Sequence, residues 1–413
     1  MLPVSVAPHL EASWQAGVAS AVITPERFIW MGGYAARDRP AEGTGLDLFA
    51  KALALEDEEG SRVVVVSMEV IGVSKGMRLR IAAEVERLYG LGPEALLLNA
   101  SHTHSGPEIY RLADTPDEAA LEDPKTRDAW QFTSGLEKRV VALVGEAIAE
   151  LAPARLTWNE ARCGFAMNRR RDYSLPDGHP NATRGPNPAG PVDHAVPALR
   201  VEAEDGRLRA VLFGYACHNT SLSGYEWSGD YAGYAQAFLQ AERPGFKAIF
   251  LTGCAGDQNP YPRRSGVVPG VSELELAQQH GRTLANAVEV AISANPIPVT
   301  GPLGLAYGEV SLDFEDPERP AHDYPVQVLR FGESLVLVAL GAEVVVDYSL
   351  RLKRELGELA SGAGIWVAAY SNDYTGYIPS VRIQNEGGYE TISGYALSTE
   401  ERIVSKVHEL FAD

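Results

Sequence analysis

The stretch that decides the fold is ALLLNASHTHSGP, residues 95–107. Its apolar start, residues 95–98, predicts a short buried strand. Side chains two apart on an extended segment point the same way, so His102 and His104 are expected to face one side where the strand ends. Neutral imidazole nitrogens are ligands that suit Zn²⁺. We therefore predict the beginning of a zinc site here. The alternative is one buried, hydrogen-bonded histidine and one surface histidine.

Several other apolar runs are also followed directly by polar side chains. RVVVVS, residues 62–67, is a strong candidate for a central strand and leads to Glu69. Four further runs, residues 210–216, 248–251, 335–340 and 365–369, lead to Cys217-His218, Gly253 to Asp257, Glu343 and Tyr374 to Tyr377, respectively. In open α/β sheets, ligands bind outside the carboxyl ends of the strands. We therefore expect these polar side chains to gather at one site.

Segments with helical periodicity lie between the strands. Residues 73–90 and 133–151 carry apolar side chains at helical spacing, and Ser272 with Glu275 has the spacing of a capping box. This alternation predicts an α/β fold of mixed β-sheets flanked by helices, with at least partly parallel pairing. No linker divides the chain, so residues 1–413 are expected to form a single domain. Residues 172–195 predict a long loop, either a flap beside the site or a passive surface excursion.

Composition excludes some classes of function. The net charge is −19 and the pI is about 5.0, which argues against nucleic acid or an anionic membrane surface as a partner. No apolar run reaches the about 18 residues that a membrane helix needs. Cys163, Cys217 and Cys254 are too few for a disulfide framework and are expected to be free thiols. No signal peptide is visible, so a cytoplasmic location is expected, although a processed secreted chain would look the same.

A catalytic zinc needs three protein ligands and one open or weakly occupied position. His102, His218 and Glu343 would supply two imidazoles and a carboxylate. Zinc-bound water, with its pKa lowered towards about 7, is then expected to attack an amide or ester carbonyl. His104 could stabilise the oxyanion or move a proton. A tyrosine such as Tyr377 could serve as a weak oxygen ligand, and Tyr389 could donate its phenol to the oxyanion.

Each of these residues also has a purely structural interpretation. A histidine after a strand, such as His218, is often a hydrogen-bonded core residue, and Glu343 could be a first-turn charge favoured by the helix dipole. The tyrosines could simply pack, and Asp257 fits an Asx turn. Two other functions stay open: Cys254 as a nucleophile with His218 as its base, and a non-catalytic ligand-binding or scaffold protein on the same fold.

Ordered motifs across the chain resemble those of the neutral (non-lysosomal) ceramidase family. SHTHSGP at 101–107 resembles that family's THTHSGP, and SGDYAGYA at 228–235 is similar to its SGDNxGYA. Further likenesses are YACHNTS at 215–221, GDQNP at 256–260, GAE at 341–343, YTGYI at 374–378 and Tyr389-Glu390. These blocks fall in the family's order and span roughly residues 15 to 400.

The resemblance implies a neutral-ceramidase-like catalytic domain that uses zinc to hydrolyse an N-acyl amide, as in ceramide. Carried over by motif, the expected zinc ligands are His102, His218, Glu343 and Tyr377. The expected catalytic contacts to the substrate are His104, Tyr389 and Arg169, the last in Asn168-Arg169, which looks like the family's Asn-Arg-Ser.

Departures from the family pattern bear on the substrate. Glu108 stands where the family usually has Gly, and Asn259 or Gln258 replaces a Ser. With Asp257, Glu108 and Asn259 are the expected substrate-binding residues. From the resemblance, residues 1–413 are expected to correspond to the family's catalytic domain, without its C-terminal immunoglobulin-like domain. The expected partner is a small-molecule amide or a lipid-like substrate, and a homo-oligomer is left open.

Overall fold

The structure is a computed structural model that describes residues 13–171, 185–241, 243–263, 268–360 and 362–412. Among these residues a nine-stranded sheet runs in the order β11-β9-β8-β6-β1-β3-β4-β5, with β13 paired to β6. Its strands are β1 (Trp14–Val22), β3 (Phe49–Asp57), β4 (Arg62–Met68), β5 (Leu96–Ala100), β6 (Ala152–Arg162), β8 (Ala195–Ala203), β9 (Leu208–Tyr215), β11 (Lys247–Thr252) and β13 (Ile297–Val299). The pairs β4/β5 and β9/β11 are parallel and the others are antiparallel.

A second sheet of four strands follows in the chain, in the order β14-β15-β16-β18. Its strands are β14 (Leu303–Leu312), β15 (His322–Phe331), β16 (Leu335–Leu340) and β18 (Gly364–Ala368), of which β16 and β18 are parallel. Three short pairs lie near the strand ends: β2 (Gly43–Thr44) with β10 (Glu226–Trp227), β7 (Ala166–Asn168) with β12 (Gln258–Pro260), and β17 (Glu343–Val344) with β19 (Tyr377–Ile378).

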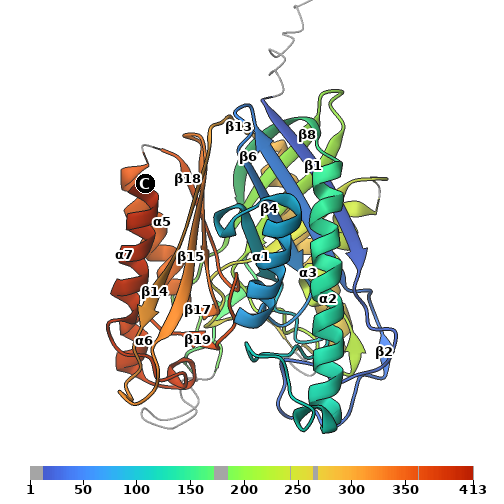
Figure 1. Cartoon of the computed structure of the whole chain (residues 1–413), viewed down its shortest axis with the longest axis vertical. Coiled ribbons are helices and arrows are strands. Elements are labelled where there is room, and N and C mark those ends of the chain that lie inside the picture. Colours follow the sequence, from blue (N-terminus) through green and yellow to red (C-terminus); the bar gives the residue numbers. More distant parts are fainter. Residues whose placement is uncertain (1–12, 172–184, 242, 264–267, 361, 413) are drawn as a thin grey trace, which may run out of the picture.

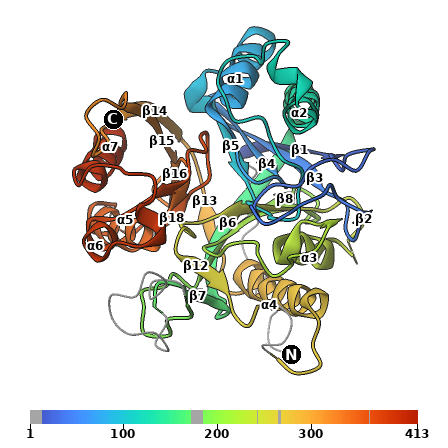
Figure 2. The same ribbon diagram turned by 90° about the horizontal axis from the view of Figure 1, so that it is seen from below.

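Helices cover the outer face of each sheet, so the molecule has four layers (Figures 1 and 2). The helices are α1 (Lys75–Tyr89), α2 (Pro124–Ala149), α3 (Asp230–Gln240), α4 (Glu273–Ser293), α5 (Val346–Leu359), α6 (Val381–Glu386) and α7 (Thr399–Ala412), with short 3-10 turns at Pro93–Ala95, Ala120–Glu122 and Tyr389–Thr391. Helices α1 to α4 pack on the large sheet, and α5 and α7 pack on the small one. The inner faces of the two sheets share one apolar core.

The run of valines in β4 shows why the sequence favours this layering. Val64 and Val66 face helices α1 and α2, whereas Val63 and Val65 face the core between the sheets. A strand that is buried on both faces is apolar at every position rather than at alternate ones. The fold class predicted from the sequence, mixed sheets flanked by helices, is therefore confirmed.

The predicted helices are also present, with changed limits at one of them. The helix predicted over residues 73–90 is α1, and Ser272 and Glu275 form the predicted capping box of α4. Helix α2 begins at Pro124, earlier than the expected residue 133, because Asp123 caps it by accepting a hydrogen bond from Thr126 N. Within the described ranges, no helix combines the length and apolarity required to cross a bilayer.

Candidate active site

Two histidines follow the ends of two strands of the large sheet and meet at one point. His102 comes after β5 and His218 after β9, and both side chains are fully buried. His102 Nδ1 lies 2.6 Å from the carbonyl oxygen of Ile71, and His218 Nδ1 lies 2.7 Å from that of Ala255. A carbonyl can only accept, so each Nδ1 carries the proton and donates it. Each Nε2 therefore presents its lone pair to the centre of the site, which is how metal-binding histidines are held.

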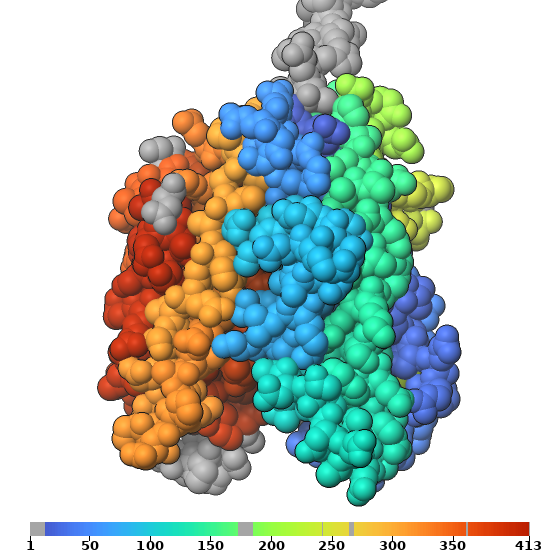
Figure 3. Space-filling view, in the orientation of Figure 1, coloured from blue at the N-terminus to red at the C-terminus, as the bar shows by residue number. Residues whose placement is uncertain are grey.

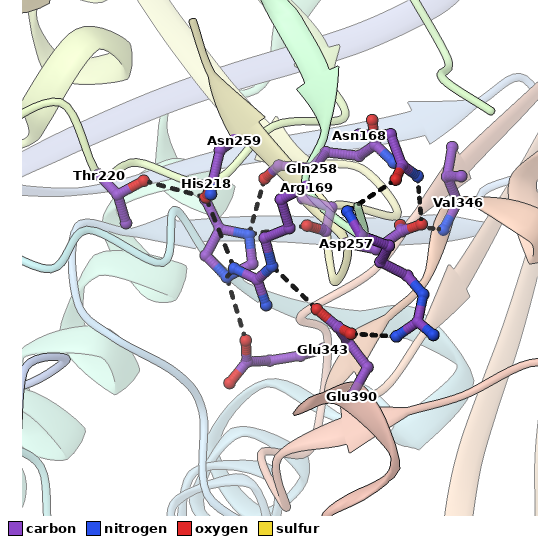
Figure 4. A network of polar contacts seen from close by, with 12 residues as sticks. Asn168, Arg169, His218, Thr220, Asp257, Gln258, Asn259, Glu343, Val346 and Glu390 are labelled. Atoms are coloured by element: carbon purple, nitrogen blue, oxygen red, sulfur yellow. Dashed lines mark hydrogen bonds and ion pairs between the residues drawn. The ribbon is translucent and has the colours of Figure 1, made fainter. Parts of the chain in front are cut away.

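Glu343 reaches the same point from the second sheet. It follows β16, and its segment pairs in parallel with the segment that begins at Tyr377, with Glu343 and Tyr377 as register partners. One oxygen of the Glu343 carboxylate, Oε2, lies 3.3 Å from His102 Nε2 and 3.2 Å from His218 Nε2. Figure 4 shows this carboxylate directed at the His218 ring. The structure thus brings together three donor atoms from residues 102, 218 and 343.

The spacing of these donors fits a zinc ion. Tetrahedral zinc with bonds of about 2.0–2.1 Å has ligand–ligand edges of roughly 3.3–3.4 Å. The carboxylate oxygen lies 3.2 and 3.3 Å from the two imidazole nitrogens. Two imidazoles and one carboxylate are also a donor set that zinc accepts in hydrolases. His102, His218 and Glu343 could therefore hold a metal ion together.

The electrostatics of the site favour the protonation states that metal binding needs. Burial, and next the guanidinium of Arg169, lower the pKa of His218 to about 3. Burial alone would raise the pKa of the Glu343 carboxyl, but the imidazoles of His102 and His218 hold this pKa well below its usual range. At neutral pH the His218 ring is therefore uncharged and Glu343 is a carboxylate, as required of ligands.

His104 lies beside these donors but is held differently. Its Nε2 is 3.1 Å from His102 Nε2, and the ligand atoms of His102, His104 and His218 all lie within 4.8 Å of one another. The three imidazoles are thus a second donor set that could bind a metal. However, His104 Nδ1 is buried without a hydrogen-bond partner, so no carbonyl orients its ring as one does for the other two.

The local path of the chain differs from the sequence expectation, although the two histidines do converge. An extended segment was expected to point both side chains to one side, but His102 has a left-handed backbone with φ of 58°. The strand has ended at Ala100, and Thr103 instead bridges to Asn219 next to His218. This bridge brings residues 102–104 against the end of β9.

Arg169 lies on the other side of His218. Its Nε donates to Glu390 Oε1 at 2.9 Å, and its Nη1 has two longer contacts, 3.4 Å to His218 Nε2 and 3.5 Å to Asn259 Oδ1. Glu390 also accepts from Arg170, so one buried carboxylate holds two successive arginines. Figure 4 shows its contact with Arg169. Arg169 Nη2 is buried and has no partner.

Two tyrosines stand beside the Arg169 guanidinium. The rings of Tyr377 and Tyr389 lie 5.3 and 5.6 Å from its central carbon and 5.1 Å from each other. Burial raises the pKa of the Tyr377 phenol well above its usual range, despite the opposing charge of Arg169. Tyr377 is thus a neutral phenol on the strand that pairs with Glu343.

These groups open into a cavity of about 660 Å³. Of the predicted site residues, its described walls include His104, Arg169, His218, Asn259, Tyr377 and Tyr389. A cavity of this size is typical of a small-molecule site. A second hollow, of about 530 Å³, lies between the end of β1 and α2 and contains none of the predicted site residues.

Two predicted substrate-binding residues lie outside the cavity walls. Asp257 is fully buried, and its carboxylate accepts from Asn168 Nδ2 at 2.8 Å and from Val346 N at 2.9 Å. It therefore joins the end of β7 to the start of α5 rather than facing the cavity. Glu108 accepts from Arg111 Nε at 3.0 Å and Nη2 at 2.9 Å and is partly exposed.

Cys254 is also away from the cavity. Its thiol is buried in the core between the small sheet and its helices, and burial raises its pKa far above the usual range. A nucleophilic cysteine needs a thiolate and access to substrate, and Cys254 has neither here. The structure removes the basis for the Cys254 alternative.

Some residues of the site were not predicted from the sequence. Tyr34 lines the cavity with its ring 4.7 Å from that of His104. It does not directly follow an apolar run, which was the sequence signal used to select candidate site residues. Glu390 stands next to Tyr389, which was the only residue of that motif to receive a role. Of the predicted loop 172–195, residues 172–184 lie outside the described residues, while Gly185 and Pro186 line the cavity.

Comparisons with known proteins agree with the ordered motifs. A sequence model described as neutral/alkaline non-lysosomal ceramidase, N-terminal, matches residues 14–265. Neutral ceramidase A of Dictyostelium discoideum is 26% identical over 279 residues, which cover 63% of this chain and 38% of that protein. Neutral ceramidase of Drosophila melanogaster is 24% identical over 265 residues, with 61% and 36% covered. The chain thus matches well under half the length of these relatives.

Solved structures share the fold over nearly the whole chain. The crystal structure of neutral ceramidase from Pseudomonas aeruginosa superposes with a TM-score of 0.77 at 20% identity and covers 97% of this chain and 74% of that one. A structure described as ceramidase complexed with C2 gives the same TM-score at 19% identity, with 97% and 76% covered.

Proposed function

The chain belongs to the neutral/alkaline non-lysosomal ceramidase family, and on that premise we propose that it is a zinc-dependent hydrolase that cleaves the C–N bond of an N-acyl amide. The observation that carries the proposal is the meeting of His102 Nε2, His218 Nε2 and Glu343 Oε2 at the edge lengths of a zinc tetrahedron. Ceramide, the substrate in the names of the relatives, is one member of this class of amide.

We assign the metal ligands to His102, His218 and Glu343, with Tyr377 as a weak fourth. The Nδ1 hydrogen bonds to Ile71 and Ala255 fix both rings for ligation, and Tyr377 is the register partner of Glu343. A bound zinc would polarise a water molecule and lower its pKa towards about 7 for attack on a carbonyl carbon.

His104 is assigned to proton transfer rather than to ligation. Its ring lacks the carbonyl that would fix its tautomer, and burial, then His102 and His218, lower its pKa well below the usual range. A neutral His104 can accept a proton at Nε2 and later deliver it to the leaving amine. The geometry leaves this nitrogen 3.1 Å from His102 Nε2, beside the metal donors.

Arg169 and Tyr389 are assigned to the substrate carbonyl oxygen. Arg169 Nη2 is a buried donor without a partner, and an unsatisfied buried donor is costly unless a ligand accepts from it. Glu390 holds the guanidinium by its Nε and Nη1 contacts His218 and Asn259, which leaves Nη2 to donate to the substrate. Donors placed in advance around a developing oxyanion are among the largest contributors to catalysis.

Metal analysis and chelation test the proposal. The purified protein is expected to hold about one zinc per chain, to lose amide hydrolysis on chelation, and to regain it with zinc. The His102→Ala, His218→Ala double variant is expected to hold none. His408→Ala is the matched control, because His408 pairs with Glu355 on the surface. Zinc retained by the double variant would refute the ligand assignment. Absence of both metal and turnover on amides and esters would favour a non-catalytic binding protein.

A further inference from the structure

The segment that carries Glu343 has a backbone conformation that its own residues do not favour. Ala342, directly before Glu343, has φ of 60°, and Tyr370 in the facing segment has φ of 53°. A side chain with a Cβ is strained in this left-handed region, and such strain persists only where surrounding contacts fix the backbone. The position of the Glu343 carboxylate therefore depends on the contacts that hold these two segments.

Backbone hydrogen bonds join Glu343 and its neighbour to the facing segment. Ala342 N donates to the carbonyl oxygen of Asp373 at 2.8 Å. Glu343 N donates to the carbonyl oxygen of Gly376 at 2.9 Å. Asp373 is thus one hydrogen bond away from the residue that precedes the carboxylate ligand, and the same segment leads to Tyr377, the register partner of Glu343.

The Asp373 carboxylate uses both of its oxygens to hold this segment. Oδ1 accepts from Tyr374 N at 2.7 Å, and Oδ2 lies 2.6 Å from His322 Nε2. Only 1% of the Asp373 side chain and 10% of the His322 side chain are exposed, so water competes little for this contact. Because a carboxylate oxygen can only accept, His322 Nε2 carries the proton and donates it.

The other nitrogen of His322 connects to the same segment by a second route. Nδ1 lies 2.8 Å from the Tyr395 hydroxyl, which lies 3.2 Å from Thr375 Oγ1. Tyr395 is buried, and its ring stacks on Phe314 with the ring centres 4.7 Å apart. With a neutral imidazole, Tyr395 donates to Nδ1 and accepts from Thr375. A chain of hydrogen bonds therefore leaves the segment at Asp373 and returns to it at Thr375.

We infer that His322 is a positioning residue for the metal centre, which acts through Asp373 to fix Glu343 and Tyr377. This inference rests on the proposed function, which assigns Glu343 and Tyr377 to the metal. His322 begins β15, so it ties a strand of the small sheet to both segments from which these ligands project. The pair with Asp373 helps to keep Glu343 Oε2 at 3.2 and 3.3 Å from the two imidazole nitrogens.

Zinc affinity and the visible spectrum of the cobalt(II) form test this role. His322→Leu removes both hydrogen bonds of the ring. We expect its zinc affinity, measured by competition with a chelator, to fall about tenfold, as for other partners that orient ligands. The cobalt band, which reports the geometry of the ligands, should shift. His322→Gln keeps an amide donor for Asp373 and should restore most of the affinity.

A matched control and a milder variant complete the test. His408→Leu removes another histidine–carboxylate pair, that of His408 on α7 with Glu355 on α5 at 2.9 Å, and should change neither readout. Tyr395→Phe keeps the ring on Phe314 but removes the hydroxyl, so it should shift the cobalt band and weaken zinc binding less than His322→Leu does. Tyr395→Phe decides the question if His322→Leu does not fold.

The outcomes separate a positioning role from a purely structural one. Unfolding at lower urea concentration, with zinc affinity and cobalt spectrum equal to those of the wild type in each folded variant of His322 and Tyr395, would overturn the inference. A wild-type chain that binds neither zinc nor cobalt would instead refute the proposed function.

Discussion

The protonation state of the His218 ring determines whether this residue can serve as a metal ligand. Its ring is buried at the cavity wall and is hydrogen-bonded through Nδ1 to two carbonyl oxygens, Ala255 at 2.7 Å and Gln258 at 3.0 Å. Both carbonyls require a proton on Nδ1, so the lone pair of Nε2 faces Glu343. In the absence of metal, a second proton would have to enter a buried site next to Arg169.

The burial of His218 gives the metal-free protein a pH dependence. Its pKa is about 3 in the folded chain and near 6.5 in the unfolded chain. The unfolded state therefore binds one more proton in this window, and the stability that this ring contributes is present above about pH 6.5 and lost as the pH falls towards 3. His218→Gln should reduce the slope of unfolding free energy against pH by about 1.4 kcal/mol per pH unit between pH 4 and 6.

Urea denaturation in the presence of a chelator measures this slope. His408→Gln, which changes a surface histidine paired with Glu355, should leave the buried contribution in place. Identical slopes for wild type and His218→Gln would mean that the His218 ring is protonated in the folded protein, contrary to the environment described.

At the scale of elements, the site is built from strand ends and the loops that close over them. The loop between β1 and β2 packs against His104. Arg37 holds the loop in place by donating hydrogen bonds to the carbonyl oxygens of Gly32, His104 and Gly224. Gly33, in this loop, has φ of 95°, and a Cβ added to it would lie 2.5 Å from His104 Cγ. The close approach of this loop to the His104 ring requires a glycine.

Gly33→Ala should therefore displace the His104 ring. We expect kcat/KM for amide hydrolysis to fall by about 100-fold, within the range that a positioned acid–base group contributes, with zinc content unchanged. Gly60→Ala is a matched control, because Gly60 has φ of 85° but nothing within 4 Å of an added Cβ. Both variants carry the strain of an alanine at positive φ, so equal activities would contradict a role for the Gly33–His104 contact.

At the scale of the molecule, the three candidate metal donors come from two sheets that pack face to face. His102 and His218 follow strands of the large sheet, and Glu343 follows a strand of the small one. The shared core includes two reciprocal contacts of tryptophan on glycine: Trp158 on Gly364 and Trp366 on Gly214. Figure 3 shows β14 and α1 side by side over this junction, where Arg78 pairs with Glu309 at 2.8 Å.

Gly364→Ala should loosen this junction. An added Cβ would lie 1.8 Å from Trp158 Cζ2, and overpacking of this kind typically costs about 1–3 kcal/mol of unfolding free energy. The proposed zinc ligands follow strands of different sheets, so a change in the packing of the two sheets should separate them. The affinity for zinc should therefore fall as well, as measured by competition with a chelator. Gly308→Ala, on β14 with its nearest atom at 3.5 Å, should change neither. Zinc affinity equal to that of the wild type in Gly364→Ala would show that the site does not depend on this packing.

The sequence by itself determined those strands that are apolar runs and the residue types that follow them, whereas β3, β6, β8, β14 and β15 were not predicted. An apolar run such as Val63 to Val66 can be recognised from consecutive residues in the sequence. A strand that is buried on both faces is apolar at every position, so such a run predicts a central strand. The polar residues that follow, His102, His218 and Glu343, were identified as one donor set because strand ends of an α/β sheet collect ligands. The prediction that these residues form a ceramidase-like donor set was based on the resemblance of the ordered motifs to that family.

Only the tertiary structure decided where those side chains point. Asp257 and Glu108 stand in loops next to the site, yet Asp257 turns inward to Asn168 and Val346, and Glu108 turns to Arg111. The role of Glu390 could be recognised only from the tertiary structure, in which its carboxylate accepts a hydrogen bond from Arg169. Contacts between residues more than 200 positions apart depend on how two sheets pack, and local periodicity carries no information about that packing.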